Sequence, residues 1–160
     1  MKKTFLFAWA ILMCSLLWGQ TTQMDLPVTF EDPTVAYGLV GFGGAENSTI
    51  VTDPTNPANK GAKGGKTPTA ELWAGTTVNL PGTPQPGFLN KIPFSEGNTR
   101  MNVRVWSPDA GIRVRLKVED YQDPTKSVET DQFTTKAGEW ETLVFDFTVP
   151  TDPPTAAINY

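Results

Sequence analysis

Apolar and polar residues alternate with a period of two along two stretches in the second half of the chain. In Ile112–Glu119, apolar residues occupy every second position and charged residues occupy the positions between them. Arg100–Trp106 follows the same rule, with Met101, Val103 and Val105 forming its apolar set. Strict alternation places one set in a core and leaves the other on an open sheet face, so both stretches are predicted strands.

The segment that joins these two strands has the composition of a tight turn. Ser107–Gly111 contains Pro, Asp and Gly, which are the residues that a short hairpin loop favours. The sequence therefore predicts that Arg100–Trp106 and Ile112–Glu119 pair directly as one hairpin. Five outward side chains would then share one face: Arg104, Trp106, Arg113, Arg115 and Lys117.

Further short strands are predicted between turn signals along the rest of the chain. They are Leu26–Glu31, Ser48–Thr52, Thr69–Ala74, Thr76–Leu80, Ser127–Thr134 and Trp140–Phe147. Trp140–Phe147 carries apolar residues on both faces, which indicates a more central strand that is partly covered on its second side. Asp53–Pro68 is rich in Pro, Asn, Gly and Lys, and we expect a mobile surface loop there. Because helical signals are nearly absent, the chain is expected to be all-β, a jelly-roll-like sandwich of two antiparallel sheets.

The two ends of the chain differ from this pattern. Residues 1–19 combine a charged start, an apolar run and a small residue at the boundary, which is typical of a secretory signal peptide cleaved before Gln20. The apolar run is shorter than the roughly 20 residues of a membrane span, and the alternative is a buried N-terminal helix. We expect residues 20–25 to be a linker and residues 26–160 to be the domain. A new apolar segment begins at Ala157–Tyr160, so we expect the domain to lack its last strands.

Composition narrows the chemistry that the mature chain can perform. Cleavage would remove the one cysteine, Cys14, and would leave 11 basic against 17 acidic residues, a net charge of -6 instead of -4. An acidic chain argues against nucleic acid and against anionic membrane surfaces as partners. With no histidine, Ser-His-Asp and Cys-His nucleophile systems are excluded, together with zinc sites built on those ligands.

Carboxylates are the candidate metal ligands that remain, and oxygen ligands suit calcium. Glu31, Asp32 and Asp146 are the candidates, the alternative for Glu31 and Asp32 being a solvated strand end. Glu129-Thr130-Asp131 is close to the Glu-x-Asp-x-x-Glu strand of retaining glycosidases, but Thr134 stands where the second catalytic carboxylate belongs. We therefore expect no enzymatic activity.

The predicted hairpin face is the candidate binding surface. An indole beside guanidinium donors suits a sugar, because a pyranose ring stacks on the aromatic ring while the forked donors reach hydroxyls or carboxylates. The alternative is an ordinary solvated face with Trp106 packed under a loop. Tyr37 and Tyr121 lie in predicted loops and are further candidates, whereas Trp73 and Trp140 are expected to be core anchors.

Several segments resemble one family of secreted modules. They are Leu26–Asp32, Glu71–Thr77, Met101–Pro108, Val114–Asp120 and Trp140–Phe147. Together they are similar to the galactose-binding-like, carbohydrate-binding-type jelly-roll domains of polysaccharide-degrading bacteria. The resemblance implies that Glu31 is a structural calcium ligand and that the chain ends before the Asp-Asp segment that completes such a site. It also implies a secreted or cell-surface protein whose partners are extracellular polysaccharide and other domains of a longer chain.

Taken together, these observations predict a non-catalytic module that binds extracellular polysaccharide. A structural or adhesive spacer within a larger secreted protein is the main alternative. A glycoside hydrolase fragment is a more distant one.

Overall fold

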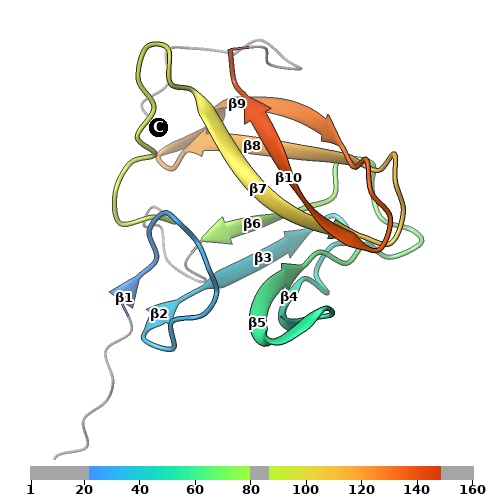
Figure 1. The fold of residues 1–160 in the computed structure, drawn as a ribbon. Coiled ribbons are helices and arrows are strands. Elements are labelled where there is room, and N and C mark those ends of the chain that lie inside the picture. The colour runs from blue at the N-terminus through green and yellow to red at the C-terminus, as the bar shows by residue number, and fades with distance from the viewer. Residues whose placement is uncertain (1–21, 80–86, 149–160) are drawn as a thin grey trace, which may run out of the picture.

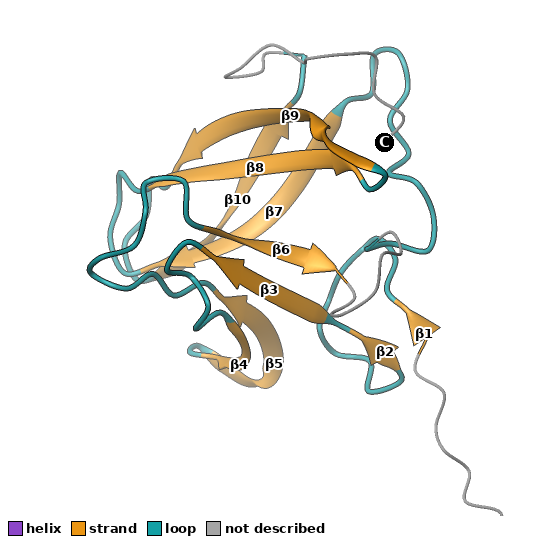
Figure 2. Ribbon diagram, turned by 180° about the vertical axis from the view of Figure 1, so that it is seen from behind, coloured by secondary structure: helices purple, strands orange, loops and turns teal. Residues whose placement is uncertain are grey.

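The structure is a computed structural model that describes residues 22–79 and 87–148, and every regular element in this part is a β-strand (Figures 1 and 2). The strands are β1 (Thr22–Gln23), β2 (Val35–Ala36), β3 (Gly38–Phe42), β4 (Thr49–Asp53), β5 (Asn56–Lys63), β6 (Gly75–Asn79), β7 (Arg100–Ser107), β8 (Arg113–Asp120), β9 (Asp123–Phe133) and β10 (Glu139–Asp146). The all-β prediction is confirmed. The predicted signal peptide and the segment after Thr148 lie outside the described residues.

The strands form two-stranded pairs, and the predicted hairpin is wrong. β7 pairs antiparallel with β10, with Trp106 opposite Trp140, and β8 pairs antiparallel with β9. The turn residues between β7 and β8 carry the chain from one pair to the other. Gly111 N donates to Thr134 O (2.7 Å), and Gly138 N donates to Ser107 O (2.7 Å). These bonds tie the connection to the segment between β9 and β10, so β7 and β8 do not meet edge to edge.

The core lies where the β7–β10 pair packs against the β8–β9 pair. Its buried side chains are Val118, Val128, Leu143, Phe145 and Phe147. The apolar sets predicted for β7 and β8 pack against this cluster, so their alternation is confirmed. Two antiparallel layers around an apolar core make a β-sandwich. The strand order of a jelly roll stays a prediction.

The first half of the described chain adds three pairs: β3 with β6, β4 with β5, and the short parallel β1 with β2. The predicted loop at Asp53–Pro68 is wrong over β5, which pairs with β4 from Thr49 opposite Lys63 onward. Backbone hydrogen bonds hold this hairpin, although its side chains are mostly small or polar. Such a sequence lacks the apolar alternation by which strands are recognised.

Two predicted strands are absent from the described structure. Over Leu26–Glu31 the chain has no regular structure, because Pro27 has no backbone N–H and Phe30 adopts a φ of 64° that a strand does not allow. Thr69–Ala74 instead folds into turns, with Ala74 N donating to Glu71 O (3.0 Å). None of the described residues forms a helix that could cross a membrane.

Candidate functional site

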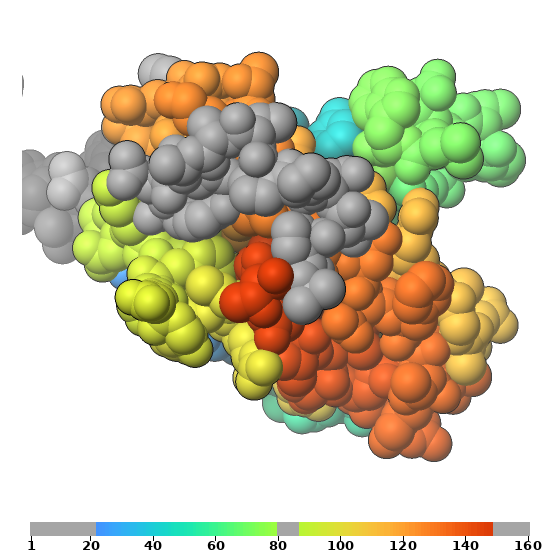
Figure 3. Space-filling view, turned by 90° about the horizontal axis from the view of Figure 1, so that it is seen from above, coloured from blue at the N-terminus to red at the C-terminus, as the bar shows by residue number. Residues whose placement is uncertain are grey.

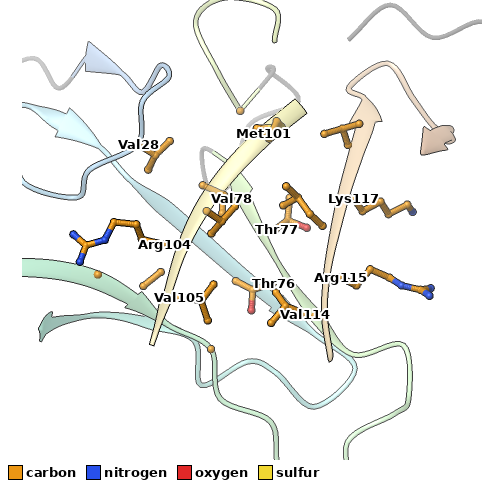
Figure 4. Close-up of a pocket in the computed structure, with 18 of the residues that line it drawn as sticks. Val28, Thr76, Thr77, Val78, Met101, Arg104, Val105, Val114, Arg115 and Lys117 are labelled. Atoms are coloured by element: carbon orange, nitrogen blue, oxygen red, sulfur yellow. The ribbon is translucent and has the colours of Figure 1, made fainter. Parts of the chain in front are cut away.

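The structure separates the five outward side chains predicted to share one face. Figure 4 shows Arg104 pointing away from one side of a central cleft, while Arg115 and Lys117 point away from the opposite side. Arg104 therefore belongs to the outer face of the β7–β10 pair, and Trp106, two positions further along the same strand, shares that face. Arg113, Arg115 and Lys117 belong to the outer face of the β8–β9 pair. A single sugar ring cannot lie against both groups at once.

The basic side chains of β8 are engaged by carboxylates of their own sheet or strand. Arg115 forms a bidentate pair with Asp131 (2.7 and 2.9 Å) and donates a further bond to Glu129 Oε1 (2.7 Å). Lys117 pairs with Glu119 (2.7 Å). These cations are paired within β8 and β9, and the Glu129 and Asp131 carboxylates that resembled a catalytic motif are bound to the Arg115 guanidinium.

On the other face, Trp140 is an anchor for the β4–β5 hairpin. Its Nε1 donates to Asp53 Oδ1 (3.0 Å), and the Arg104 guanidinium carbon lies 5.1 Å from the centroid of its ring. A cation over an indole face is attracted by the ring quadrupole. Trp140 is thus covered by a cation and bonded to a carboxylate, so the second face of its strand is partly covered as predicted. The strand is not central among the described strands, because β10 pairs with β7 alone.

Asp53 is the polar centre of this contact and is itself buried. It also accepts bonds from Asn59 Nδ2 (2.9 Å) and from the amide and hydroxyl of Thr55 (2.7 Å each). Burial raises the pKa of Asp53, but the hydrogen bonds from Asn59, Thr55 and Trp140 outweigh it and hold the pKa well below its usual value. The carboxylate is therefore ionised and fully used in holding the hairpin.

Trp106 is only partly exposed, and its environment matches the alternative of a packed residue. Its indole Nε1 is buried and has no hydrogen-bond partner within the described part of the chain. An indole in this state offers less surface for stacking than a free ring. The β7–β10 part of the predicted face thus contributes the exposed cation Arg104 but not an open aromatic surface.

An open aromatic surface lies elsewhere, at the junction of β3 and β6. Trp73 is 66% exposed and Phe42 is 40% exposed, and their rings stack with an interplanar angle of 12° and a centroid separation of 6.0 Å. The neighbouring Leu72 is 94% exposed. We call Phe42, Leu72 and Trp73 the aromatic platform. The expectation that Trp73 is a core anchor is wrong, since the segment expected to be a strand is a turn.

Two glycines let the rings of the platform approach the backbone. A Cβ atom at Gly43 would lie 2.7 Å from the Trp73 ring, and one at Gly75 would lie 2.8 Å from the Phe42 ring. Gly43 also has a φ of 66°, which favours glycine. Glycines near both aromatic residues were therefore a sequence signal for this surface. Only the fold shows that the rings of Phe42 and Trp73 meet.

Backbone bonds hold the loop that carries Trp73. Thr67 N donates to Gly44 O (2.9 Å), and Glu71 N donates to Gly43 O (2.8 Å). Seen from above, the green part of the chain that contains this loop projects as a lobe at the rim of the molecule (Figure 3). Leu72 and Trp73 are thus presented to solvent on a loop that backbone bonds tie to Gly43 and Gly44, next to Phe42 at the end of β3.

The two predicted loop tyrosines lie apart from the platform along the chain. Tyr37 lies between β2 and β3. The centroid of its ring is 5.3 Å from that of Phe30, and its hydroxyl is 3.5 Å from Thr29 Oγ1. Tyr121 lies in the turn between β8 and β9, where its hydroxyl accepts a bond from Gln122 Nε2 (2.9 Å). Tyr121 is exposed and Tyr37 is partly buried, so neither extends the stacked pair.

The three predicted calcium ligands are not brought into one group. Asp146 pairs with Arg100 (2.8 Å), Asp32 accepts bonds from Thr34, and Glu31 accepts the Lys60 backbone N–H. Within residues 22–79 and 87–148, no cluster of three or more acidic side chains is arranged to hold a metal ion. The side chains as placed do not fit a calcium site, and calcium binding stays a prediction.

Comparison with family models, curated proteins and solved structures found no match to this chain. The resemblance to carbohydrate-binding-type modules therefore stays a prediction. The proposal below rests on the geometry of the described residues.

Proposed function

We propose that this chain is an exported, non-catalytic module that binds polysaccharide through the aromatic platform. The observation that carries the proposal is the stacked and exposed pair of Phe42 and Trp73. Adjoining exposed apolar side chains are more typical of binding surfaces than single ones, so the exposed ring pair supports this proposal. Among the described residues, these two rings form the one stacked aromatic pair, and the other two aromatic pairs are tilted.

A pyranose ring is the ligand that suits this surface. Its apolar face packs on an aromatic plane, and its hydroxyls remain free to bond to water or to neighbouring polar groups. The fixed loop supports the same use, because a surface that is already ordered loses little conformational entropy when a ligand binds. An extracellular setting would bring the module to polysaccharide, and the predicted signal peptide supports such a setting.

The first prediction concerns Trp73. Trp73→Ala should weaken glycan binding at least about tenfold, because loss of a stacking ring costs on the order of 1.4 kcal/mol or more. Affinity electrophoresis in gels that contain β-glucan, xylan or alginate measures the effect as lost retardation. The melting temperature should change little, since Trp73 is mostly exposed.

Tyr121→Ala is the matched control, because it removes another exposed aromatic ring outside the platform. It should leave retardation unchanged. Loss of binding in Trp106→Ala, with Trp73→Ala unaffected, would move the site to the β7–β10 face. A folded wild-type protein that no glycan retards would contradict the proposal and favour a spacer, and hydrolysis of any of these glycans would contradict the non-catalytic role.

A further inference from the structure

The basic side chains of the described chain fall into two groups that differ in their partners. From β7 onward each has one: Arg104 lies over the Trp140 ring, and the others pair with carboxylates, namely Arg100, Arg113, Arg115, Lys117, Lys126 and Lys136. The lysine side chains before β7 have no carboxylate or aromatic partner among the described residues, and all are exposed: Lys60, Lys63, Lys66 and Lys91. Uncompensated positive charge is therefore confined to the first part of the described chain.

Two of these lysines lie on the segment that connects β5 with the aromatic platform. Lys63 is the last residue of β5 and stands opposite Thr49 in the ladder. Lys66 precedes Thr67, whose N–H donates to Gly44 O (2.9 Å) in the loop that follows β3. Both lysines border the cleft of Figure 4, and so do all three residues of the platform. Positive charge and stacking surface thus adjoin one space.

The carboxylates that border this cleft are already engaged. Among the described residues they are Asp53, Glu119, Asp120 and Glu129. Each has a hydrogen-bond donor or a cation as its partner within the described chain. Glu46 and Glu71 lie close to the platform along the chain but do not border the cleft. The platform side of the cleft therefore offers cations that no neighbouring carboxylate offsets, in a chain whose net charge is -4.

We propose that the ligand of the aromatic platform is an acidic polysaccharide, whose carboxylate or sulfate groups lie against Lys63 and Lys66. A sugar ring that carries such a group has an apolar face for the indole of Trp73 and an anionic edge for lysine. Lysine is a flexible point charge with three donors, so it suits either anion. The inference rests on the proposed function, because it names the class of polysaccharide that the same surface binds.

The net charge of the chain makes this arrangement selective in position. An acidic protein repels a polyanion over most of its surface, and attraction is left where cations outweigh carboxylates. Complementary charge at an interface contributes more to specificity and to the association rate than to affinity. The lysines are therefore expected to select the charged polymer and to direct it to the platform, while stacking on the rings supplies the contact that both charged and neutral sugars make.

Glycans that differ only in charge test the proposal on the full chain. One pair is polygalacturonate and its methyl ester, and the other is carrageenan and its desulfated form. In calorimetric titration at low salt, the acidic member of a pair should bind about fivefold more tightly than the neutral one. The difference should vanish at about 1 M salt, where screening is nearly complete. A preference in the first pair assigns carboxylate, and one in the second pair assigns sulfate.

Lys63→Gln combined with Lys66→Gln should remove this preference and leave binding of the neutral glycans unchanged. Lys136→Gln is the matched control, because it removes an exposed lysine that does not border the cleft, and it should keep the preference. Trp73→Ala should weaken both members of each pair. A preference that survives in the double lysine variant would overturn the proposal.

Two further outcomes separate this inference from the proposed function. Equal binding of the acidic and neutral members of both pairs would overturn the acidic ligand and leave a polysaccharide-binding platform. Binding of none of the four glycans would overturn the proposed function as well. Polyglutamate carries carboxylates without a sugar ring, so binding of polyglutamate as tight as that of polygalacturonate would show simple ion exchange and overturn the proposal.

Discussion

At the scale of single residues, the tripeptide Asp-Pro-Thr occurs three times in the described chain and forms the same turn each time. In each of the Asp-Pro-Thr sequences that begin at Asp32, Asp53 and Asp123, the Asp carboxylate accepts both the amide and the hydroxyl of the Thr two positions later. This is the local bonding expected of Asp before a turn. Asp53 differs because it also accepts bonds from Asn59 and Trp140. The same local chemistry therefore serves a long-range contact in one of the three turns.

Asp53→Ala should accordingly destabilise the protein far more than Asp123→Ala. The first change removes the acceptor of a partly buried indole N–H and frees the β4–β5 hairpin from β10. We expect the melting temperature to fall by roughly 5–10 °C in Asp53→Ala and by less than about 3 °C in Asp123→Ala. Equal losses in the two variants would show that the Trp140 contact contributes little.

At the scale of elements, the strands with clear alternation were predictable and their partners were not. β7 and β8 lie within one residue of the predicted ranges, because burial of one face imposes a period of two. Their pairing depends on which edge each strand meets in space. A turn such as Ser107–Gly111, which contains Pro, Asp and Gly, can connect strands of two different layers as well as the two strands of a hairpin. Because this pairing was predicted wrongly, side chains that belong to two different strand pairs were predicted to share one binding face.

The missed strands include β3 and β5, and they differ in apolar signal: β3 contains Leu39, Val40 and Phe42 between glycines, whereas the side chains of β5 are mostly small or polar. β5 is held by its ladder to β4, with Val51 opposite Gly61 and Ile50 opposite Ala62. The aromatic platform was missed for a related reason: Trp73 lies in a turn that brings it to Phe42, and no local pattern reports a contact between distant segments. Aromatic residues beside glycines gave the only sequence signal for it.

Gly61 provides a test of how the β4–β5 hairpin packs. A methyl group at this position would lie 3.8 Å from Cη2 of Trp140, an ordinary contact distance. Gly61→Ala should therefore stabilise the protein by about 0.5–1 kcal/mol, chiefly by restricting the unfolded chain, and raise the melting temperature by about 2–5 °C. Gly111→Ala should have the opposite effect, because Gly111 has a φ of 78°. A loss of stability in Gly61→Ala would mean that the hairpin is packed more tightly against β10 than described.

At the scale of the whole molecule, many carboxylates are hydrogen-bonded as anions. Hydrogen bonds lower the pKa of Asp25, Asp32, Asp123 and Glu141, and bonds from the Thr148 hydroxyl and Arg100 lower the pKa of Asp146 to about 2. A folded-state pKa below the unfolded value of roughly 4 stabilises the protein above that value. The stabilisation is lost as pH falls through the folded-state pKa.

The melting temperature should therefore be nearly constant from about pH 7 to pH 5 and fall steeply between about pH 4 and pH 2. Thermal unfolding followed across this range measures the effect. Asp146→Asn should make the fall shallower, because it removes one of the groups that titrate. A melting temperature that stays constant or rises below pH 4 would contradict this account.

The glycines beneath the aromatic platform determine which mutations would abolish ligand binding. Gly43 and Gly75 have no side chain to offer a ligand, yet any larger residue at either position collides with a platform ring. A screen that selects only for loss of ligand capture would recover substitutions at positions 43 and 75 together with those at position 73. More positions therefore determine the surface than the residues that touch its ligand, and two of these three positions carry glycine.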